Sequence, residues 1–397
     1  MTRYLFVVPP LVGHINPLVG VAAELTARGH RVAWAGHPDY INELVGPAAD
    51  LYPCDTPSGL HRPPELRGIA ALQFLWQEFF VPLADSMAPG VDRAIAAFHP
   101  DVVVTDQQTV AGALAAERHH LPYVTSATTP AEFSGSLDSV PKVAEWIAGL
   151  LTELRARHGA TEPHDLRFSP HGVLAFSTPE LAGQAERPGI HWVGPAIAER
   201  PAPDFPWEWL DPDRALVLVS LGTVNTNVGA RFLTECAAAA HARRNRLQTV
   251  IVDPGGVLTD DEAGPGSDDS VLVAPRVPQL PLLERASAVV CHAGHNTVAE
   301  SLWHGVPLVV APVRDDQPVI AAQVTECGAG VRVRFGRAGR EHIGAALDAV
   351  LTQPEHRAAA LRVQSAFRAA GGAAAAADHL EALAPTPTRL AEAELPT

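Results

Sequence analysis

Positive charge is scarce in this chain of 397 residues. Arginine and lysine together number 29 against 44 aspartate and glutamate residues, which gives a formal net charge of -15, and Lys142 is the only lysine. A nucleic-acid groove or an anionic membrane surface requires a basic stripe. We therefore expect no nucleic-acid partner, and any phosphate that the chain binds must be met by a local site.

Cysteine and long apolar runs are scarce as well. Cys54, Cys236, Cys291 and Cys327 lack the spacing of a metal site or a disulfide framework, so we expect reduced thiols and a cytoplasmic protein. No stretch approaches the roughly 20 apolar residues of a membrane span, and none is expected. The 47% of hydrophobic residues indicates a compact chain, and its length favours two domains.

Short β-rich runs alternate with helical segments in two consecutive series. The first series has runs at 4–8, 31–36, 101–105, 122–126 and 173–177, and the second at 215–222, 247–253, 270–275, 287–294 and 307–313. Near-continuous apolar strands separated by helices indicate parallel sheets covered on both faces. We predict an α/β protein with two Rossmann-like, doubly wound parallel-sheet domains that face each other across a cleft.

A segment rich in proline and acidic residues separates the two series and cannot continue either sheet. We predict a first domain at 1–198, a linker at 199–213 and a second domain at 214–375. The last part, 376–397, is predicted to hold a helix end and a tail, and both disorder and packing against the first domain stay open for it.

The most informative stretch lies late in the second series. A strand there ends at His292-Ala-Gly294, where the lack of side-chain bulk lets a ligand approach the backbone. A helix is predicted to begin near Asn296 or Thr297. Helix amino ends at the carboxyl ends of parallel strands bind phosphate, so we predict a phosphate site to which His292 adds a hydrogen bond.

The same residues also have structural interpretations. Thr297 and Glu300 fit a T-x-x-E capping box. His292 and His295 have a spacing that metal ligands use, but no third partner is evident. Each structural interpretation is favoured singly, whereas one bound nucleotide-sugar would explain nearly all of the residues together.

Several short motifs follow one another in order across this stretch. They are V-P-Q at 277–279, H-A-G at 292–294, Asn296-Thr297, Glu300, G-V-P at 305–307, Pro312 and Asp316-Gln317. In this order they resemble the donor-binding signature of glycosyltransferase family 1, which includes UDP-glycosyltransferases of plants and animals and antibiotic and macrolide glycosyltransferases of actinobacteria. The resemblance covers most of the chain, weakens in insertions at 55–90 and 128–170, and implies the GT-B architecture.

The resemblance also implies roles in binding a nucleotide-sugar. The Val277 backbone would pair with the base, beside Gln279, and Glu300 would accept hydrogen bonds from ribose hydroxyls. Arg276 stands where the family often has a tryptophan that stacks on the base; a guanidinium can also stack, and UDP and dTDP both stay open. The diphosphate would be held by His292, beside Gly294, and by the amides of Asn296 and Thr297, and the sugar hydroxyls by Asp316 and Gln317. Apart from the resemblance, Thr223 at the end of S-L-G-T could offer a second phosphate contact, and an ordinary strand-end turn stays open there.

The first strand is followed by GHINP, which places His14 just before a predicted helix with Asn16 as N-cap and Pro17 at its first position. The positive helix end should disfavour imidazolium and keep the ring available as a base. The resemblance implies that His14 is the catalytic base and Asp106 the carboxylate that orients it. Asp101 begins the same strand and would lie at its wrong end.

The implied reaction is an inverting displacement in which the acceptor hydroxyl loses its proton to His14 and attacks the anomeric carbon. The leaving diphosphate would be stabilised by the helix end and His292, so we expect no cofactor and no metal. The string Asp211-Pro-Asp213 has the D-x-D form of metal-dependent glycosyltransferases, but it falls in the linker, away from the predicted cleft.

Aromatic residues of the irregular insertions are candidates for binding an apolar small-molecule acceptor. Their spacing fits a core-facing helix at least as well. The candidates are Phe74, Trp76, Phe79, Phe80 and Phe133.

Three other functions compete with sugar transfer to a natural product. A dinucleotide oxidoreductase is weakened because no G-x-G-x-x-G follows the first strand. A nucleotide-sugar epimerase of the same architecture and a non-catalytic helper that only binds nucleotide-sugar remain. The aspartate and glutamine pair at 316–317 favours a hexose with free hydroxyls, glucose first, and deoxysugar donors stay open.

Overall fold

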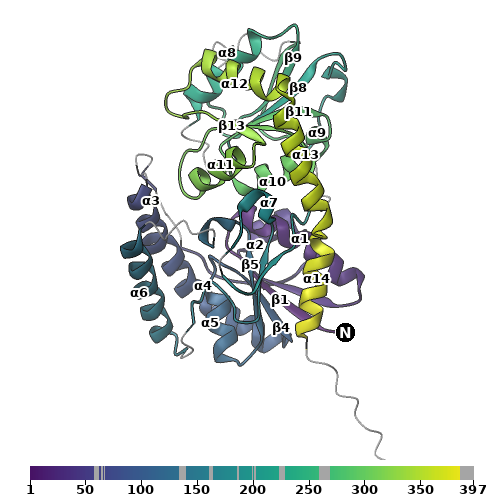
Figure 1. The fold of residues 1–397 in the computed structure, drawn as a ribbon. Coiled ribbons are helices and arrows are strands. Elements are labelled where there is room, and N and C mark those ends of the chain that lie inside the picture. The colour runs from purple at the N-terminus through teal and green to yellow at the C-terminus, as the bar shows by residue number, and fades with distance from the viewer. Residues whose placement is uncertain are drawn as a thin grey trace, which may run out of the picture.

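The computed structural model describes residues 1–57, 62–63, 66, 68–133, 140–160, 164–185, 187–198, 200, 203–222, 229–258 and 269–384. These residues form two α/β domains, one above the other in Figure 1, each built on a parallel sheet covered by helices. No helix in these ranges is both long and apolar enough to cross a membrane.

The first sheet follows the order β3-β2-β1-β4-β5-β6-β7, with each neighbouring pair parallel. Its strands are β1 (Arg3–Val7), β2 (Arg31–Gly36), β3 (Asp50–Pro53), β4 (Val102–Asp106), β5 (Tyr123–Ala127), β6 (Val173–Ala175) and β7 (Ile190–Trp192). The helices around it are α1 (Val12–Ala27), α2 (Pro38–Leu44), α3 (Gly68–Phe74), the π-helix η1 (Leu75–Phe80), α4 (Val81–Phe98), α5 (Ala111–Arg118), the 3-10 turn η2 (Pro130–Glu132), α6 (Pro141–Arg157) and α7 (Pro179–Ala182).

The second sheet follows the order β10-β9-β8-β11-β12-β13 and is also parallel. Its strands are β8 (Ala215–Ser220), β9 (Leu247–Val252), β10 (Val271–Ala274), β11 (Ala286–Cys291), β12 (Leu308–Val310) and β13 (Gly330–Arg332). The remaining helices are the 3-10 turn η3 (Trp207–Trp209), α8 (Ala230–His241), α9 (Gln279–Leu283), α10 (His295–Trp303), α11 (Gln317–Glu326), α12 (Arg340–Thr352), α13 (Pro354–Ala369) and α14 (Gly372–Leu383).

The fold class predicted from the alternating runs is confirmed. All ten expected runs contain a strand, because buried parallel strands are apolar throughout and stand out from the helices. Three strands escaped notice: β3, β7 and β13 lie at or near the sheet edges and have only three or four residues each. Their residues are mostly exposed or half-buried, so no continuous apolar run marks them.

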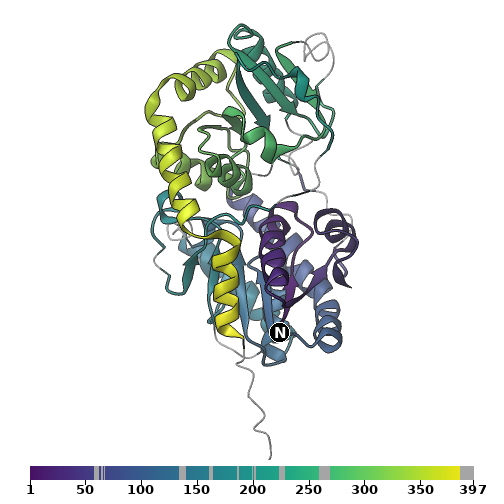
Figure 2. The same ribbon diagram turned by 90° about the vertical axis from the view of Figure 1, so that its right-hand side faces the viewer.

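The C-terminal helices connect the two domains. Helix α13 packs on the core of the second domain, and α14 then packs along α1 of the first (Figure 2). Arg28 at the end of α1 fixes this return, because its guanidinium donates to Asp378 at 2.6 Å and to Glu381 at 2.7 Å. The expected segment from 376 thus begins inside α14, and residues 385–397 lie outside the described ranges.

The linker also belongs structurally to the second domain. Its aromatic and apolar side chains pack on that domain's core: Phe205, Trp207, Trp209 and Leu210. Asp211 is engaged by its neighbour Arg214, whose Nε lies 3.0 Å from the carboxylate. The D-x-D string therefore lies just before the amino end of β8, not at the carboxyl ends of the strands where the predicted site residues lie.

Candidate functional site

His14 lies in the first turn of α1, not before the helix as the sequence predicted. The helix begins at Val12, Asn16 is not its N-cap, and Pro17 lies inside it. Local preferences misplace this start because a proline within a helix leaves one carbonyl without an amide partner. The carbonyl left open is that of Gly13, and it accepts a hydrogen bond from the Asn296 side chain of the second domain. Sequence preferences around residue 14 cannot reveal such a contact.

His14 forms a dyad with Asp106, the last residue of β4. The histidine Nδ1 lies 2.9 Å from Asp106 Oδ2, and the carboxylate is fully buried. The other oxygen, Oδ1, accepts from the Gln108 amide at 2.9 Å, which fixes the carboxylate plane. Because an ionised carboxylate can only accept, Nδ1 carries the proton, and the imidazole is held with Nε2 available as a base. Asp101, in contrast, bonds the Arg3 amide at the opposite end of the strand, as expected.

Thr128 is a third member of this group that the sequence analysis missed. Its hydroxyl lies 2.8 Å from His14 Nδ1 and 3.4 Å from Asp106 Oδ2. The geometry fits a hydroxyl that accepts a share of the Nδ1 proton and donates to the carboxylate. Thr128 follows β5, so it emerges from the same sheet edge as Asp106; a polar run directly after a strand was the available signal.

Burial and charge act in opposite directions on His14. Burial lowers its pKa, but the negative charge and hydrogen bond of Asp106, helped by Asp316 and Glu132, outweigh burial and raise the pKa above the ordinary 6.5. The expectation that the helix end would hold this ring neutral therefore gives the wrong net direction. A raised pKa makes His14 a stronger base once it is deprotonated.

His292 lies across the cleft, at the end of β11 and between two glycines. A Cβ on Gly222 would lie 2.7 Å from its ring Cε1, and a Cβ on Gly294 would overlap its Nε2. Burial lowers the pKa of His292 to about 4, so the ring is neutral at neutral pH. Its buried Nδ1 has no hydrogen-bond partner among the described residues.

Helix α10 begins at His295, with Gly294 as N-cap, one or two residues earlier than predicted. A glycine cap supplies no side chain and the first turn has no acidic residue, so the first amides keep their capacity to bind a phosphate. Thr297 and Glu300 form no capping box, because Thr297 lies inside the helix. His295 is no metal ligand here: its Nε2 lies 3.1 Å from the Phe176 carbonyl of the first domain.

Glu300 is a buried carboxylate whose two oxygens are both engaged. Gln279 donates to Oε2 at 2.6 Å, and Arg200 of the linker forms an ion pair with Oε1. Arg200 was missed because it falls in the segment interpreted only as a linker. Val277 packs against the core of the second domain, while the Arg276 side chain is 73% exposed and pairs with Glu43 of the first domain.

The predicted sugar-binding pair lies at the start of α11. Asp316 Oδ2 accepts from the Thr129 hydroxyl of the first domain at 2.7 Å, and burial raises the pKa of Asp316. Gln317 Oε1 accepts from the Val313 and Arg314 amides, which leaves its amide group as the donor for a ligand. The pair therefore faces the dyad across the domain junction.

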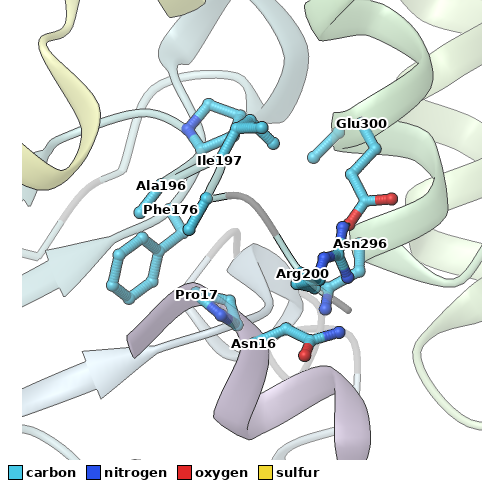
Figure 3. A pocket seen from close by; sticks show the side chains of 11 residues that line it. Asn16, Pro17, Phe176, Ala196, Ile197, Arg200, Asn296 and Glu300 are labelled. Atoms are coloured by element: carbon cyan, nitrogen blue, oxygen red, sulfur yellow. The ribbon is translucent and has the colours of Figure 1, made fainter. Parts of the chain in front are cut away.

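A small cavity lies between the domains, beside the side chains of Asn296 and Glu300 (Figure 3). Its wall is formed by the start of α1, the chain around 195–200 and one face of α10. Arg200 and Glu300 meet on one side of it, and Asn296 extends from α10 toward α1. Thr223, the remaining predicted diphosphate contact, lies outside the described residues.

The predicted acceptor residues divide into two groups. Trp76, Phe80 and Phe133 are 2%, 4% and 6% exposed and belong to the core of the first domain. Their acceptor role stays a prediction, which this packing does not support. Phe74 and Phe79 are only half-buried and keep exposed surface.

Beside the buried rings lies an ionic group that the sequence analysis did not single out. Arg167 pairs with Asp165 at 2.7 Å and with Glu132 at 3.1 Å, and its guanidinium lies over the Trp76 ring at 5.8 Å. Glu132 directly follows the turn that carries Thr128 and Thr129. In the described part of the chain, no cluster of three or more histidine, cysteine or acidic side chains could hold a metal ion.

Comparison with known proteins gives one consistent result. The family model of UDP-glucoronosyl and UDP-glucosyl transferases matches residues 187–369. Demethyllactenocin mycarosyltransferase of Streptomyces fradiae is 31% identical over 96% of this chain and 87% of the relative. The 4'-demethylrebeccamycin synthase of Lentzea aerocolonigenes is 28% identical over 96% of this chain and 99% of its own.

The fold comparison agrees. The crystal structure of the calicheamicin glycosyltransferase CalG4 superposes with a TM-score of 0.78 at 25% identity, covering 96% of this chain and 98% of that one. A GT-B architecture, a match to the family model over residues 187–369 and relatives that align along nearly the whole chain lead to one conclusion. The chain belongs to glycosyltransferase family 1, the family of the UDP-glycosyltransferases and the antibiotic glycosyltransferases.

Proposed function

We propose that this chain is a metal-independent, inverting glycosyltransferase that moves a hexose from a UDP- or dTDP-sugar to a hydroxyl of an apolar natural product. His14 is the base, and the second domain holds the donor. The observation that carries the proposal is the position of the His14–Asp106 dyad directly opposite Asp316, which bonds Thr129 of the first domain at 2.7 Å. The proposed base, His14, and the proposed sugar-binding carboxylate, Asp316, thus lie at the same place between the two domains.

The dyad supplies the acid–base part of the reaction. Its Nδ1 is engaged by Asp106 and Thr128, and Nε2 has no hydrogen-bond partner in the described part of the chain. The acceptor O–H proton passes to Nε2 while the acceptor oxygen bonds the anomeric carbon. Asp106 stabilises the imidazolium that forms, in the manner of the hydrolase triads. Displacement from the opposite face turns an α-linked donor into a β-glycoside.

The leaving group is met by the second domain. As the bond from the anomeric carbon to the phosphate oxygen breaks, negative charge develops on the nucleoside diphosphate. The amino end of α10 faces that charge with preorganised amide donors, and His292 adds one more when its single ring proton is on Nδ1, the nitrogen without a partner among the described residues. These groups supply stabilisation without a metal.

The sugar and the acceptor are proposed on less specific grounds. Asp316 and the Gln317 amide offer an acceptor and a donor for vicinal hydroxyls, which favours a hexose, glucose first. The natural-product class follows from relatives such as the oleandomycin glycosyltransferase of Streptomyces antibioticus, 28% identical over 94% of this chain. Half-buried Phe74 and Phe79 suit an apolar acceptor.

A donor and acceptor matrix tests the proposal. UDP- and dTDP-hexoses are each incubated with phenolic and polyketide acceptors, with and without a metal chelator, and products are read by the mass added. A product heavier by one hexose, with a β-linkage by NMR and at the same rate in chelator, is expected. Donor converted to another nucleotide-sugar without any acceptor would identify an epimerase instead, and tight donor binding without turnover would identify a helper protein.

A further inference from the structure

A proline interrupts the helix that carries the proposed base. Pro17 lies inside α1 and has no amide hydrogen, so it cannot donate to the carbonyl four residues earlier, that of Gly13. Gly13 is the residue directly before His14. The interruption therefore leaves an open acceptor in the backbone turn that sets the position of the base.

A side chain from the other domain fills this acceptor. Asn296 Nδ2, on the first turn of α10, donates to the Gly13 carbonyl oxygen at 2.9 Å. Figure 3 shows Asn296 on α10 and Pro17 on α1 at the two sides of the cavity between the domains. Since the proposed phosphate contact uses the amide at 296, the side chain is free to make this bond while a donor is held.

We propose that Asn296 and Pro17 are positioning residues that set the distance between donor and base. The inference rests on the proposed function, because α10 holds the diphosphate and α1 carries His14. The bond from Asn296 to the Gly13 carbonyl joins the first turn of α10, which holds the donor, to the first turn of α1, which carries the base. Gly13 is bonded directly to His14 through the backbone, so a shift of its carbonyl also moves the histidine. Transfer rates respond steeply to such distances, since a misplacement of about 1 Å can cost about 100-fold.

Four proteins form the test: the parent, Asn296→Ala, Pro17→Ala and the double variant. Asn296→Ala is expected to lower kcat about tenfold and to change the dissociation constant of UDP or dTDP less than about threefold, because the backbone amide remains. In Pro17→Ala the new amide donates to the Gly13 carbonyl inside the helix and weakens the bond to Asn296. Adding Asn296→Ala to that variant is then expected to lower kcat by less than about threefold more.

Two controls make the comparison specific. Pro89 also lies inside a helix, α4, in the same domain. Pro89→Ala restores an amide in a helix whose main contacts are with α5 and η1 of its own domain, so Asn296→Ala should keep its full effect in that background. If Pro17→Ala does not fold, Pro17→Ser restores the same amide and replaces it in the cycle.

Urea unfolding gives a readout that does not need activity. Asn296→Ala leaves the Gly13 carbonyl unpaired only when residue 17 is proline, so it should lower the unfolding midpoint more in the parent than in Pro17→Ala. Equal effects of Asn296→Ala in both backgrounds, on kcat and on the midpoint, would overturn the inference. So would a loss of nucleotide affinity in both, which would make the side chain a phosphate ligand. If the parent transfers no sugar, the proposed function fails, and the unfolding cycle still decides the coupling.

Discussion

Replacing Asp106 by asparagine separates the two effects of the carboxylate on His14. The variant keeps the size of the side chain but removes the charge that lies 2.9 Å from Nδ1. A hydrogen bond to a charged group is worth about 1.5–3 kcal/mol, so kcat should fall about 10- to 150-fold. The fall is larger if the asparagine amide donates to Nδ1 and stabilises the wrong tautomer, which in the serine-protease triad costs about 10⁴-fold.

The pH profile of the same variant makes the prediction sharper. His14 acts as a base only when deprotonated, so the rate rises with pH through its pKa, which in the parent lies above 6.5. Removing Asp106 removes the charge and the bond that raise this pKa and leaves the burial that lowers it. The acid limb of kcat against pH should therefore move to lower pH even though the plateau falls.

The assay measures initial rates at saturating donor and acceptor from about pH 5 to pH 9. Asp101→Asn, at the opposite end of the same strand, is the matched control and should keep the parent profile. An Asp106→Asn enzyme with the parent kcat, or one whose acid limb moves to higher pH, would refute the assignment of the dyad.

Three further changes test the surrounding site. Thr128→Val should lower kcat about 2- to 12-fold, with unchanged nucleotide affinity by calorimetry, because it removes one neutral hydroxyl beside the dyad. An unchanged kcat would show that this hydroxyl does not contribute to the reaction. Gly294→Ala should lower the melting temperature and weaken nucleotide binding, because the new Cβ displaces the His292 ring while the backbone φ of -66° accepts alanine. Adding His292→Ala should restore the melting temperature but not the affinity. Normal affinity in Gly294→Ala would contradict the packing argument. Arg200→Ala should free one oxygen of Glu300 and improve the affinity for UDP more than for dTDP, which lacks the 2'-hydroxyl; equal changes for both nucleotides would show that the ion pair does not tune the ribose site.

The sequence was sufficient for the architecture, because parallel strands buried on both faces are apolar throughout and their periodic alternation with helices is a local signal. The dyad came from the family resemblance, which implied both His14 and Asp106. The structure brings them together because β1 and β4 are parallel neighbours, and the two residues lie at or beyond the carboxyl ends of these strands. Thr128 follows the next strand and satisfied the same rule, but a hydroxyl carries no chemical signature of its own.

What the sequence did not contain are contacts between segments far apart. The Asn296–Gly13 bond and the Arg200–Glu300 pair each join residues at least 100 positions apart, the first between the two domains and the second between the linker and α10. The start of α1 was misplaced for the same reason. Pro17 leaves the Gly13 carbonyl without an amide donor, and the group that satisfies it, Asn296, lies on another domain and is not visible in the local sequence. Trp76 and Phe80 show a second limit. Their helical spacing identifies one apolar face, but the spacing is the same whether that face contacts a ligand or, as here, the core of the domain.

The central claim is that His14 removes the acceptor proton while the second domain holds the donor. His14→Ala tests it most directly, with transfer followed by product mass and donor binding by calorimetry on the same preparation, and with the exposed His342→Ala as control. Transfer is expected to fall about 10²- to 10⁴-fold while the dissociation constant of the nucleotide stays within about threefold of the parent. Transfer at the parent rate in His14→Ala would contradict the account.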